Sequence, residues 1–119
     1  MSKSLYERLG GAERIQAIAN DIVEFHLVNP IIAPRFQNHD VPKLKQFAFE
    51  FFCAGTGGPE TYTGRDMRTA HTGMNISEQE YLATMDDIIR AMEKHGVGSQ
   101  ERNEVIAVLY SLKGEIIRV

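Results

Sequence analysis

The sequence has little of several features that would assign it to other classes of protein. It holds one cysteine, Cys53, in 119 residues, which excludes an internal disulfide framework and fits a reducing compartment. No stretch approaches the roughly 18 apolar residues of a membrane span, and the segment Met1–Arg8 lacks the apolar part of an export signal. With 13 basic and 16 acidic residues the net charge is −3, so no polybasic surface for nucleic acid is indicated. We therefore expect a soluble, cytoplasmic protein that binds neither nucleic acid nor a membrane.

The motifs of common catalytic and metal sites are missing too. The four histidines form no H-x-x-x-H pair, and one cysteine cannot build a zinc site. The sequence contains no G-x-S-x-G, no C-x-x-C and no phosphate-binding G-x-x-x-x-G-K-[ST] loop. We therefore assign no catalytic residue.

What is present is the length of one domain and a pattern of helices. Apolar residues between Ile15 and Leu27 recur at i, i+3, i+4 and i+7, the spacing of an amphipathic helix, which Asn29-Pro30 ends. A second helix is predicted to begin after Asp40 and to reach Gly55. Its apolar stripe consists of Leu44, Phe47, Ala48, Phe51 and Phe52. The chain is thus expected to fold as one domain over residues 1–119.

The second half of the chain continues this pattern. Residues 56–66, rich in glycine and turn formers, predict a loop, and Met67–His71 predicts one helical turn capped by Asp66. A capping box, S-x-x-E, opens a helix at Ser77. The last helix is expected to start at Ser99 and to turn Val105, Ile106, Leu109, Leu112 and Ile116 inward. No alternating run predicts a strand, so the predicted fold class is all-α.

Two features of the middle of the chain bear on function. Five of the six phenylalanines lie between Phe36 and Phe52, and they fit either a packed core or the wall of a slot for a flat apolar cofactor. His71 follows the glycine-rich loop, where a lone histidine is most often structural or solvated. Taken together, an aromatic slot and one histidine on a separate segment are what a haem iron needs.

Several phrases of the sequence resemble the group 1 (N-type) truncated haemoglobins, in the same order and spacing. They are Leu5-Tyr6-Glu7-Arg8-Leu9-Gly10-Gly11, Phe36, Phe51-Phe52, Gly57-Gly58-Pro59-Glu60, Tyr62-Thr63-Gly64, Met67-Arg68-Thr69-Ala70-His71-Thr72-Gly73 and Ile76. The resemblance runs from about Leu5 to Ile117. It implies a shortened globin, a two-over-two helical sandwich that holds haem b and its iron.

The resemblance also implies roles for single residues. His71 matches the proximal iron ligand, Met67 the lining of that side, and Phe36 the aromatic wedge against the ring. The residues that match the distal-side helix are Leu44, Phe47, Ala48, Phe51 and Phe52. The pairs Gly10-Gly11 and Gly57-Gly58 match the motifs that let this short fold turn tightly.

Two positions depart from the family's pattern. Val23 stands where the family usually has a tyrosine that bonds iron-bound dioxygen, and Ala48 stands where it often has an assisting glutamine. An apolar distal pocket is therefore expected. Phe47 replaces a residue that is often polar near the haem propionates, a contact that either Lys43 or Lys45 could supply.

The expected function is the binding of diatomic ligands, namely dioxygen, carbon monoxide or nitric oxide, for storage, transport or sensing. The alternatives are a nitric oxide dioxygenase and a globin-shaped interaction module without haem, and a reductase is a candidate partner. The expected state is a monomer or a weak oligomer. His26, three residues after Val23, either packs between helices or turns its imidazole into the pocket as a donor or a sixth iron ligand.

Overall fold

The computed structural model describes residues 3–36 and 39–119, and within these ranges it consists of helices joined by turns and loops, without a named strand. The first two residues of the Met1–Arg8 segment lie outside them. The α-helices are α1 (Leu5–Arg8), α2 (Gly11–Val28), α3 (Val41–Gly55), α4 (Met67–His71), α5 (Glu78–Lys94) and α6 (Ser99–Ser111). Two short 3₁₀ helices, η1 (Ala33–Phe36) and η2 (Lys113–Glu115), complete them. The all-α prediction is confirmed.

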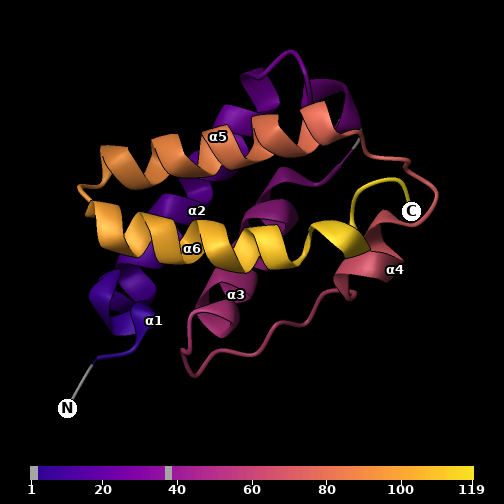
Figure 1. Ribbon diagram of the computed structural model, residues 1–119. Coiled ribbons are helices and arrows are strands. Elements are labelled where there is room, and N and C mark those ends of the chain that lie inside the picture. The colour runs from indigo at the N-terminus through magenta and orange to yellow at the C-terminus, as the bar shows by residue number, and fades with distance from the viewer. Residues whose placement is uncertain (1–2, 37–38) are drawn as a thin grey trace.

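The long helices form two layers. Figure 1 shows α5 and α6 as an antiparallel pair that lies in front of α2 and α3. Helix α2 packs against both α3 and α5, so it joins the layers, while α4 packs against η2 near the C-terminal end. This is the expected two-over-two arrangement of helices.

Local signals place most helix ends where the sequence predicts them. The Asp40 carboxylate accepts a hydrogen bond from the Lys43 backbone N–H at 3.2 Å and so caps α3. Ser77 and Glu80 form the predicted capping box at the start of α5. Asp66 occupies the N-cap position of α4, but its side chain makes no capping hydrogen bond. The predicted cap is thus correct in position and wrong in its hydrogen bond.

The two glycine pairs serve different geometric needs. Gly10 has φ +105° in the tight turn between α1 and α2, a conformation that other residues rarely adopt. Gly58 instead lies so close to the Tyr6 ring that a Cβ atom would clash with it. Its backbone N–H donates to the Cys53 carbonyl at 2.8 Å and closes the end of α3. A close approach to α1, as well as tight turning, explains the second pair.

The core lies between α2, α5 and α6. Ile15 and Met92 are 2% exposed, and Val105 from α6 packs in the same cluster. Helix α6 ends at Ser111, so Leu112 and Ile116, predicted as part of its inward stripe, lie at its C-cap and after η2. Both are half-buried rather than buried. The change from α- to 3₁₀-helix, with Gly114 inside η2, interrupts the helical spacing there.

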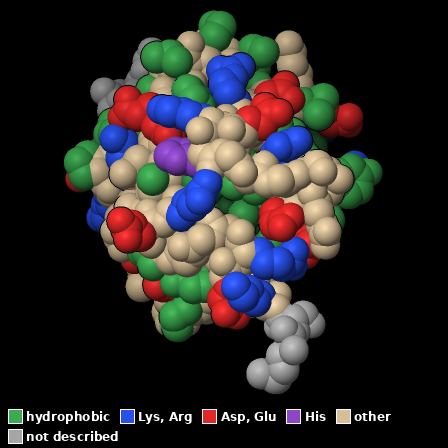
Figure 2. Space-filling model, turned by 90° about the vertical axis from the view of Figure 1, so that its left-hand side faces the viewer, with side chains coloured by type: hydrophobic (Ala, Val, Ile, Leu, Met, Phe, Trp, Pro, Cys, Tyr) green, Lys and Arg blue, Asp and Glu red, His purple; other side chains and the backbone are tan. Residues whose placement is uncertain are grey.

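The surface carries charges of both signs. Figure 2 shows the end of the molecule near α1 and the α5–α6 turn, where basic and acidic side chains are interspersed. Two ion pairs belong to this end, Arg8 with Glu104 at 2.6 Å and Lys94 with Asp21 at 3.2 Å. Among the described residues, no helix combines the length and apolar character that a membrane crossing requires.

Candidate functional site

A cavity of about 300 Å³ opens between the two layers. All of α2, α3, α4, α5 and α6 contribute to its wall, together with η1 and the loop after α3. The structure places all nine sequence-predicted site residues on this wall: Val23, Phe36, Leu44, Phe47, Ala48, Phe51, Phe52, Met67 and His71. Side chains up to 48 positions apart in the sequence therefore meet around one space.

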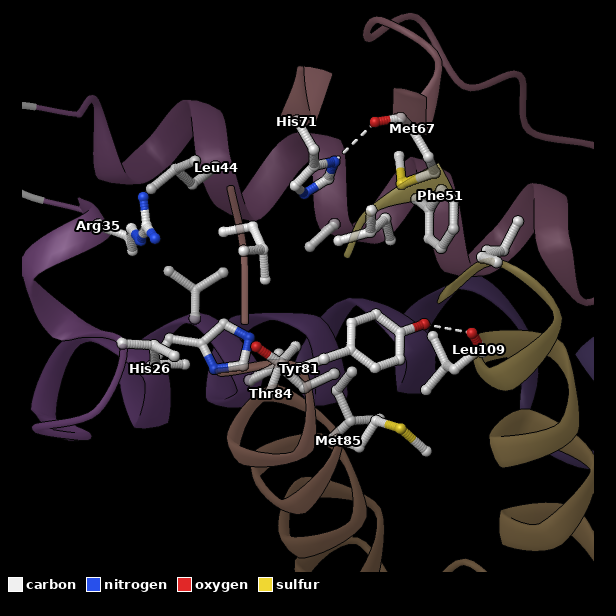
Figure 3. Close-up of a pocket in the computed structure, with 18 of the residues that line it drawn as sticks. His26, Arg35, Leu44, Phe51, Met67, His71, Tyr81, Thr84, Met85 and Leu109 are labelled. Carbon is white, nitrogen blue, oxygen red and sulfur yellow. Dashed lines mark hydrogen bonds between the residues drawn. The ribbon is translucent and has the colours of Figure 1, made fainter. Parts of the chain in front are cut away.

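His71, the last residue of α4, points its imidazole into the cavity (Figure 3). Its Nδ1 atom lies 2.7 Å from the carbonyl oxygen of Met67, one turn earlier in the same helix. Because a carbonyl only accepts, Nδ1 carries the hydrogen, and in the tautomer without a hydrogen on Nε2 the lone pair of that atom faces the cavity. This is the state in which an imidazole can bind a metal ion.

The α3 side of the cavity is an aromatic wall. Phe51 packs edge-on against Phe52, with ring centroids 5.8 Å apart, and against Tyr62, with centroids 5.6 Å apart. Phe47 meets the same Tyr62 ring at 6.3 Å. These phenylalanines are only half-buried, because their free faces border the cavity. Of the remaining central phenylalanines, Phe49 packs against the core instead.

A second stretch of the wall lacks hydrogen-bonding side chains. Val23 comes from α2, and Leu44 and Ala48 come from successive turns of α3. None of the three has a polar side-chain atom, so this part of the cavity offers no hydrogen-bond donor. Lys43 and Lys45 are the two lysines expected to contact the haem propionates. Of these, Lys45 forms an ion pair with Glu24, with its Nζ atom 2.7 Å from a carboxylate oxygen.

His26 packs between helices and at the same time lines the cavity, while its role as a donor or an iron ligand stays a prediction. It packs between α2 and α5, where its Nδ1 atom lies 2.8 Å from an Asp87 carboxylate oxygen, and it also lines the cavity. Its ring stacks on Phe36 with centroids 5.6 Å apart. Burial lowers the pKa of His26, an effect that Asp87 partly offsets. Burial therefore favours the neutral form of His26.

The cavity wall also holds residues that the sequence analysis missed. Tyr81 donates its hydroxyl hydrogen to the Leu109 carbonyl. Arg35 forms a two-point ion pair with Glu80, at 2.6 and 3.0 Å, which lowers the pKa of Glu80 to about 2. The i, i+4 spacing of Tyr81 and Met85 was a detectable signal for the α5 part of the wall. The Arg35–Glu80 pair spans 45 residues, and no local pattern indicates it.

Other chemically active side chains lie outside the cavity. Cys53 is fully buried next to Glu60, and burial raises the pKa of its thiol to about 12. Such a thiol stays protonated and unreactive. Among the described residues, no group of three or more histidine, cysteine, aspartate or glutamate side chains could hold a metal ion. A metal ion in the cavity would therefore need ligands from a bound cofactor in addition to the one imidazole of His71.

The chain is similar to proteins that carry the globin fold. Residues 4–118 match the model of the family described as bacterial-like globin. The group 1 truncated hemoglobin GlbN of Mycolicibacterium paratuberculosis is 28% identical over 113 residues, which cover 95% of this chain and 83% of the relative. The group 1 truncated hemoglobin GlbN of Nostoc sp. (strain MUN 8820) is 25% identical over 114 residues, 96% of this chain and 97% of the relative.

Solved structures agree with this relationship at the level of the fold. The Fe(III) form of truncated hemoglobin from Tetrahymena pyriformis superposes with a TM-score of 0.95 at 24% identity, covering 98% of this chain and 100% of that one. The group II truncated hemoglobin from Bacillus anthracis gives 0.89 at 21% identity, covering 100% and 94%. Because the family model spans nearly the whole chain, this protein belongs to the bacterial-like globin family, within which it resembles the group 1 truncated haemoglobins.

Proposed function

We propose that residues 1–119 form a single globin domain that binds haem b in the cavity, with the Nε2 atom of His71 as the proximal ligand of the iron. The observation that carries this proposal is the His71 imidazole, fixed by the Met67 carbonyl at 2.7 Å with Nε2 free toward an apolar cavity. A hydrogen bond to the second ring nitrogen is the usual way in which proteins orient an imidazole for a metal.

The remaining wall fits the same group. A flat, mostly apolar macrocycle requires apolar faces, and Phe36, Phe47, Phe51 and Phe52 border the cavity with half-buried rings. Met67 lies on the His71 side of the cavity and supplies further apolar surface. For the anionic propionates we assign Lys43, because Lys45 is paired with Glu24. When bound, haem iron supplies an open coordination position for a small gas molecule.

The ligands of this site are diatomic gases, and dioxygen is expected to leave quickly. Bound dioxygen carries partial negative charge, which a hydrogen-bond donor stabilises by about 1.5–3 kcal/mol. Val23, Leu44 and Ala48 offer no donor, and the Tyr81 hydroxyl is turned away toward Leu109. We therefore propose rapid oxygen exchange, as in transport, in the cytoplasm, with a reductase to restore oxidised iron.

Absorption spectroscopy of the purified protein tests this function. Haem would give an intense band near the violet edge, and the variant His71→Ala should lose most of its haem or regain the spectrum on addition of imidazole. His95→Ala is the matched control, because His95 pairs with Asp21 at 2.7 Å and does not line the cavity. A colourless wild-type protein after reconstitution with haem, or a normal spectrum in His71→Ala, would refute the assignment.

A further inference from the structure

The polar side chains of the cavity wall are almost all engaged with protein groups. The hydroxyls of Tyr62, Tyr81 and Thr84 donate to backbone carbonyl oxygens. Arg35 and Glu80 pair with each other at the cavity edge. None of these hydroxyls can thus donate to a molecule inside the cavity without breaking a bond in the protein, although each keeps lone pairs that accept a hydrogen bond.

Among the described residues of the wall, two imidazoles each keep a basic nitrogen without a protein partner. In both His71 and His26 the Nδ1 atom is held by the protein, by the Met67 carbonyl at 2.7 Å and by Asp87 at 2.8 Å. Within the described part of the chain, the Nε2 atom of neither ring has a hydrogen-bond partner. Figure 3 shows the two rings entering the cavity from different helices, His71 from α4 and His26 from α2. His71 is assigned to the iron, which leaves the Nε2 atom of His26 without a role.

The hydrogen bonds around Asp87 determine which nitrogen of His26 carries the hydrogen. The Asn29 side-chain oxygen accepts from the Ile31 backbone N–H at 3.1 Å, so the Asn29 amide nitrogen must face Asp87. That nitrogen donates to both Asp87 oxygens, at 3.3 and 3.1 Å. An Asp87 carboxylate only accepts, so opposite it Nδ1 of His26 is the donor. In the neutral ring Nε2 then has a lone pair and no hydrogen.

The surroundings favour the neutral ring and also stabilise its charge when it gains a proton. His26 is 8% exposed, and burial lowers its pKa. Asp87, which is fully buried, would stabilise an imidazolium at 2.8 Å. Arg90 lies beyond Asp87, 3.9 Å from its other oxygen. The other charged or titratable groups that face the cavity with His26 are Arg35, Tyr62, His71, Glu80 and Tyr81.

We propose that His26, held by Asp87, is the proton acceptor for small weak acids HX, such as hydrogen sulfide or hydrogen cyanide, which enter the cavity neutral and remain there as X⁻. This rests on the proposed haem site opposite His71. The H–X bond breaks heterolytically, its electron pair stays on X, and the proton forms a bond with Nε2 of His26. No electron is transferred, and the imidazolium faces the anion on one side and Asp87 on the other. An aprotic gas needs no such partner, so His26 selects for protic ligands.

The test compares one protic and one aprotic probe on the ferric, haem-loaded protein. His26→Gln should slow the association of hydrogen cyanide at pH 7 by about 100-fold, the lower end of what a positioned acid–base group contributes. The association of nitric oxide, which releases no proton, should change by less than about threefold. The matched control is His95→Gln, another histidine paired with an aspartate, outside the cavity. It should leave both rates unchanged.

A second measurement does not depend on ligand kinetics. Nitrogen-15 NMR of the diamagnetic, carbon monoxide-bound protein should show His26 with hydrogen on Nδ1 and none on Nε2 at pH 7. Hydrogen on Nε2, an equal loss of both association rates in His26→Gln, or a low-spin ferric spectrum that His26→Gln abolishes would each overturn the inference. Failure to bind haem overturns the proposed function instead, and absorption reveals it before any ligand is added.

Discussion

Helices α2 and α3 carry the same kind of apolar stripe and bury it to different degrees. Ile15, Ile18 and Ala19 on α2 are at most 5% exposed, and both isoleucines lie in one core cluster with buried residues of α5 and α6. On α3 only Cys53 is buried, and the predicted stripe from Leu44 to Phe52 is half-buried against the cavity. Helical spacing thus shows which face of a helix points inward. It does not show whether protein atoms or a ligand occupy the space in front of that face.

The largest expected effect is the stabilisation that haem gives to the half-buried stripe of α3. If haem fills the cavity, the native state gains binding free energy that the unfolded chain lacks, about 4 kcal/mol at a free haem concentration 1,000-fold above Kd. Thermal unfolding of the haem-free and reconstituted proteins would measure the gain. Hydrogen exchange should show new protection mainly in α3 and α4. Equal protection gained in the core segment of α2 would remove the distinction between the two regions.

A cavity-creating substitution in the buried stripe of α2 should lower the unfolding free energy whether or not haem is present. Ile15→Ala removes buried atoms from the core cluster and should cost about 2–5 kcal/mol of unfolding free energy. Urea unfolding of both forms of the protein measures it, with Phe51→Ala as the counterpart on the cavity wall. We expect Phe51→Ala to cost markedly less in the haem-free form. A similar cost for both substitutions without haem would mean that α3 is packed as fully as α2.

Phe36 links the two regions, because it lines the cavity and stacks on His26. Its side chain should contribute about 1.5–3 kcal/mol of apolar burial to haem retention. Phe36→Ala should then speed haem transfer to an acceptor globin by about ten- to a hundredfold. Phe25→Ala, a substitution away from the cavity wall, is the control. An unchanged transfer rate in Phe36→Ala would exclude contact with the ring.

Val23 lies where the packed stripe of α2 reaches the cavity, and it is 5% exposed. Val23→Tyr adds a hydroxyl donor to a wall without one and should slow oxygen dissociation by about ten- to a hundredfold. Stopped-flow mixing of the oxygenated protein measures this rate, with Val23→Phe to separate bulk from hydrogen bonding. Slow release in the native protein that His26→Ala abolishes would show instead that His26 is a donor.

The contrast between α2 and α3 also explains how much of the structure the sequence predicts. Helices with strong spacing and local caps, such as α3 after Asp40 and α5 after Ser77, could be predicted because their signals lie within a few residues. The nine site residues came from a family resemblance, since periodicity alone fitted a packed core equally well. The engagement of His26 with Asp87, 61 residues away, depends on how α2 meets α5. No local pattern contains that information.

The smallest expected effect concerns the ion pair of Arg35 and Glu80, which ties η1 to the start of α5 at the cavity edge. Hydrogen bonding to Arg35 lowers the pKa of Glu80 from 4.5 to about 2. Between these values the unfolded chain binds more protons than the folded one, so stability falls as the pH falls. The contribution is complete above about pH 4.5 and is lost toward pH 2. Because the Arg35 side chain is 33% exposed and solvent screens the pair, we expect about 1 kcal/mol.

Glu80→Gln tests this contribution because it keeps an oxygen that can accept from the Ser77 backbone N–H, as Glu80 does at 3.0 Å. The pKa values of Asp21, Glu50 and Glu104 are also lowered, so both proteins should lose stability in acid. The informative quantity is therefore the difference between their unfolding free energies in urea. That difference should be about 1 kcal/mol at neutral pH and should shrink as the pH falls below about 4.5. Parallel curves down to about pH 3 would show that Arg35 and Glu80 stabilise neither the cavity edge nor the start of α5 through their charges.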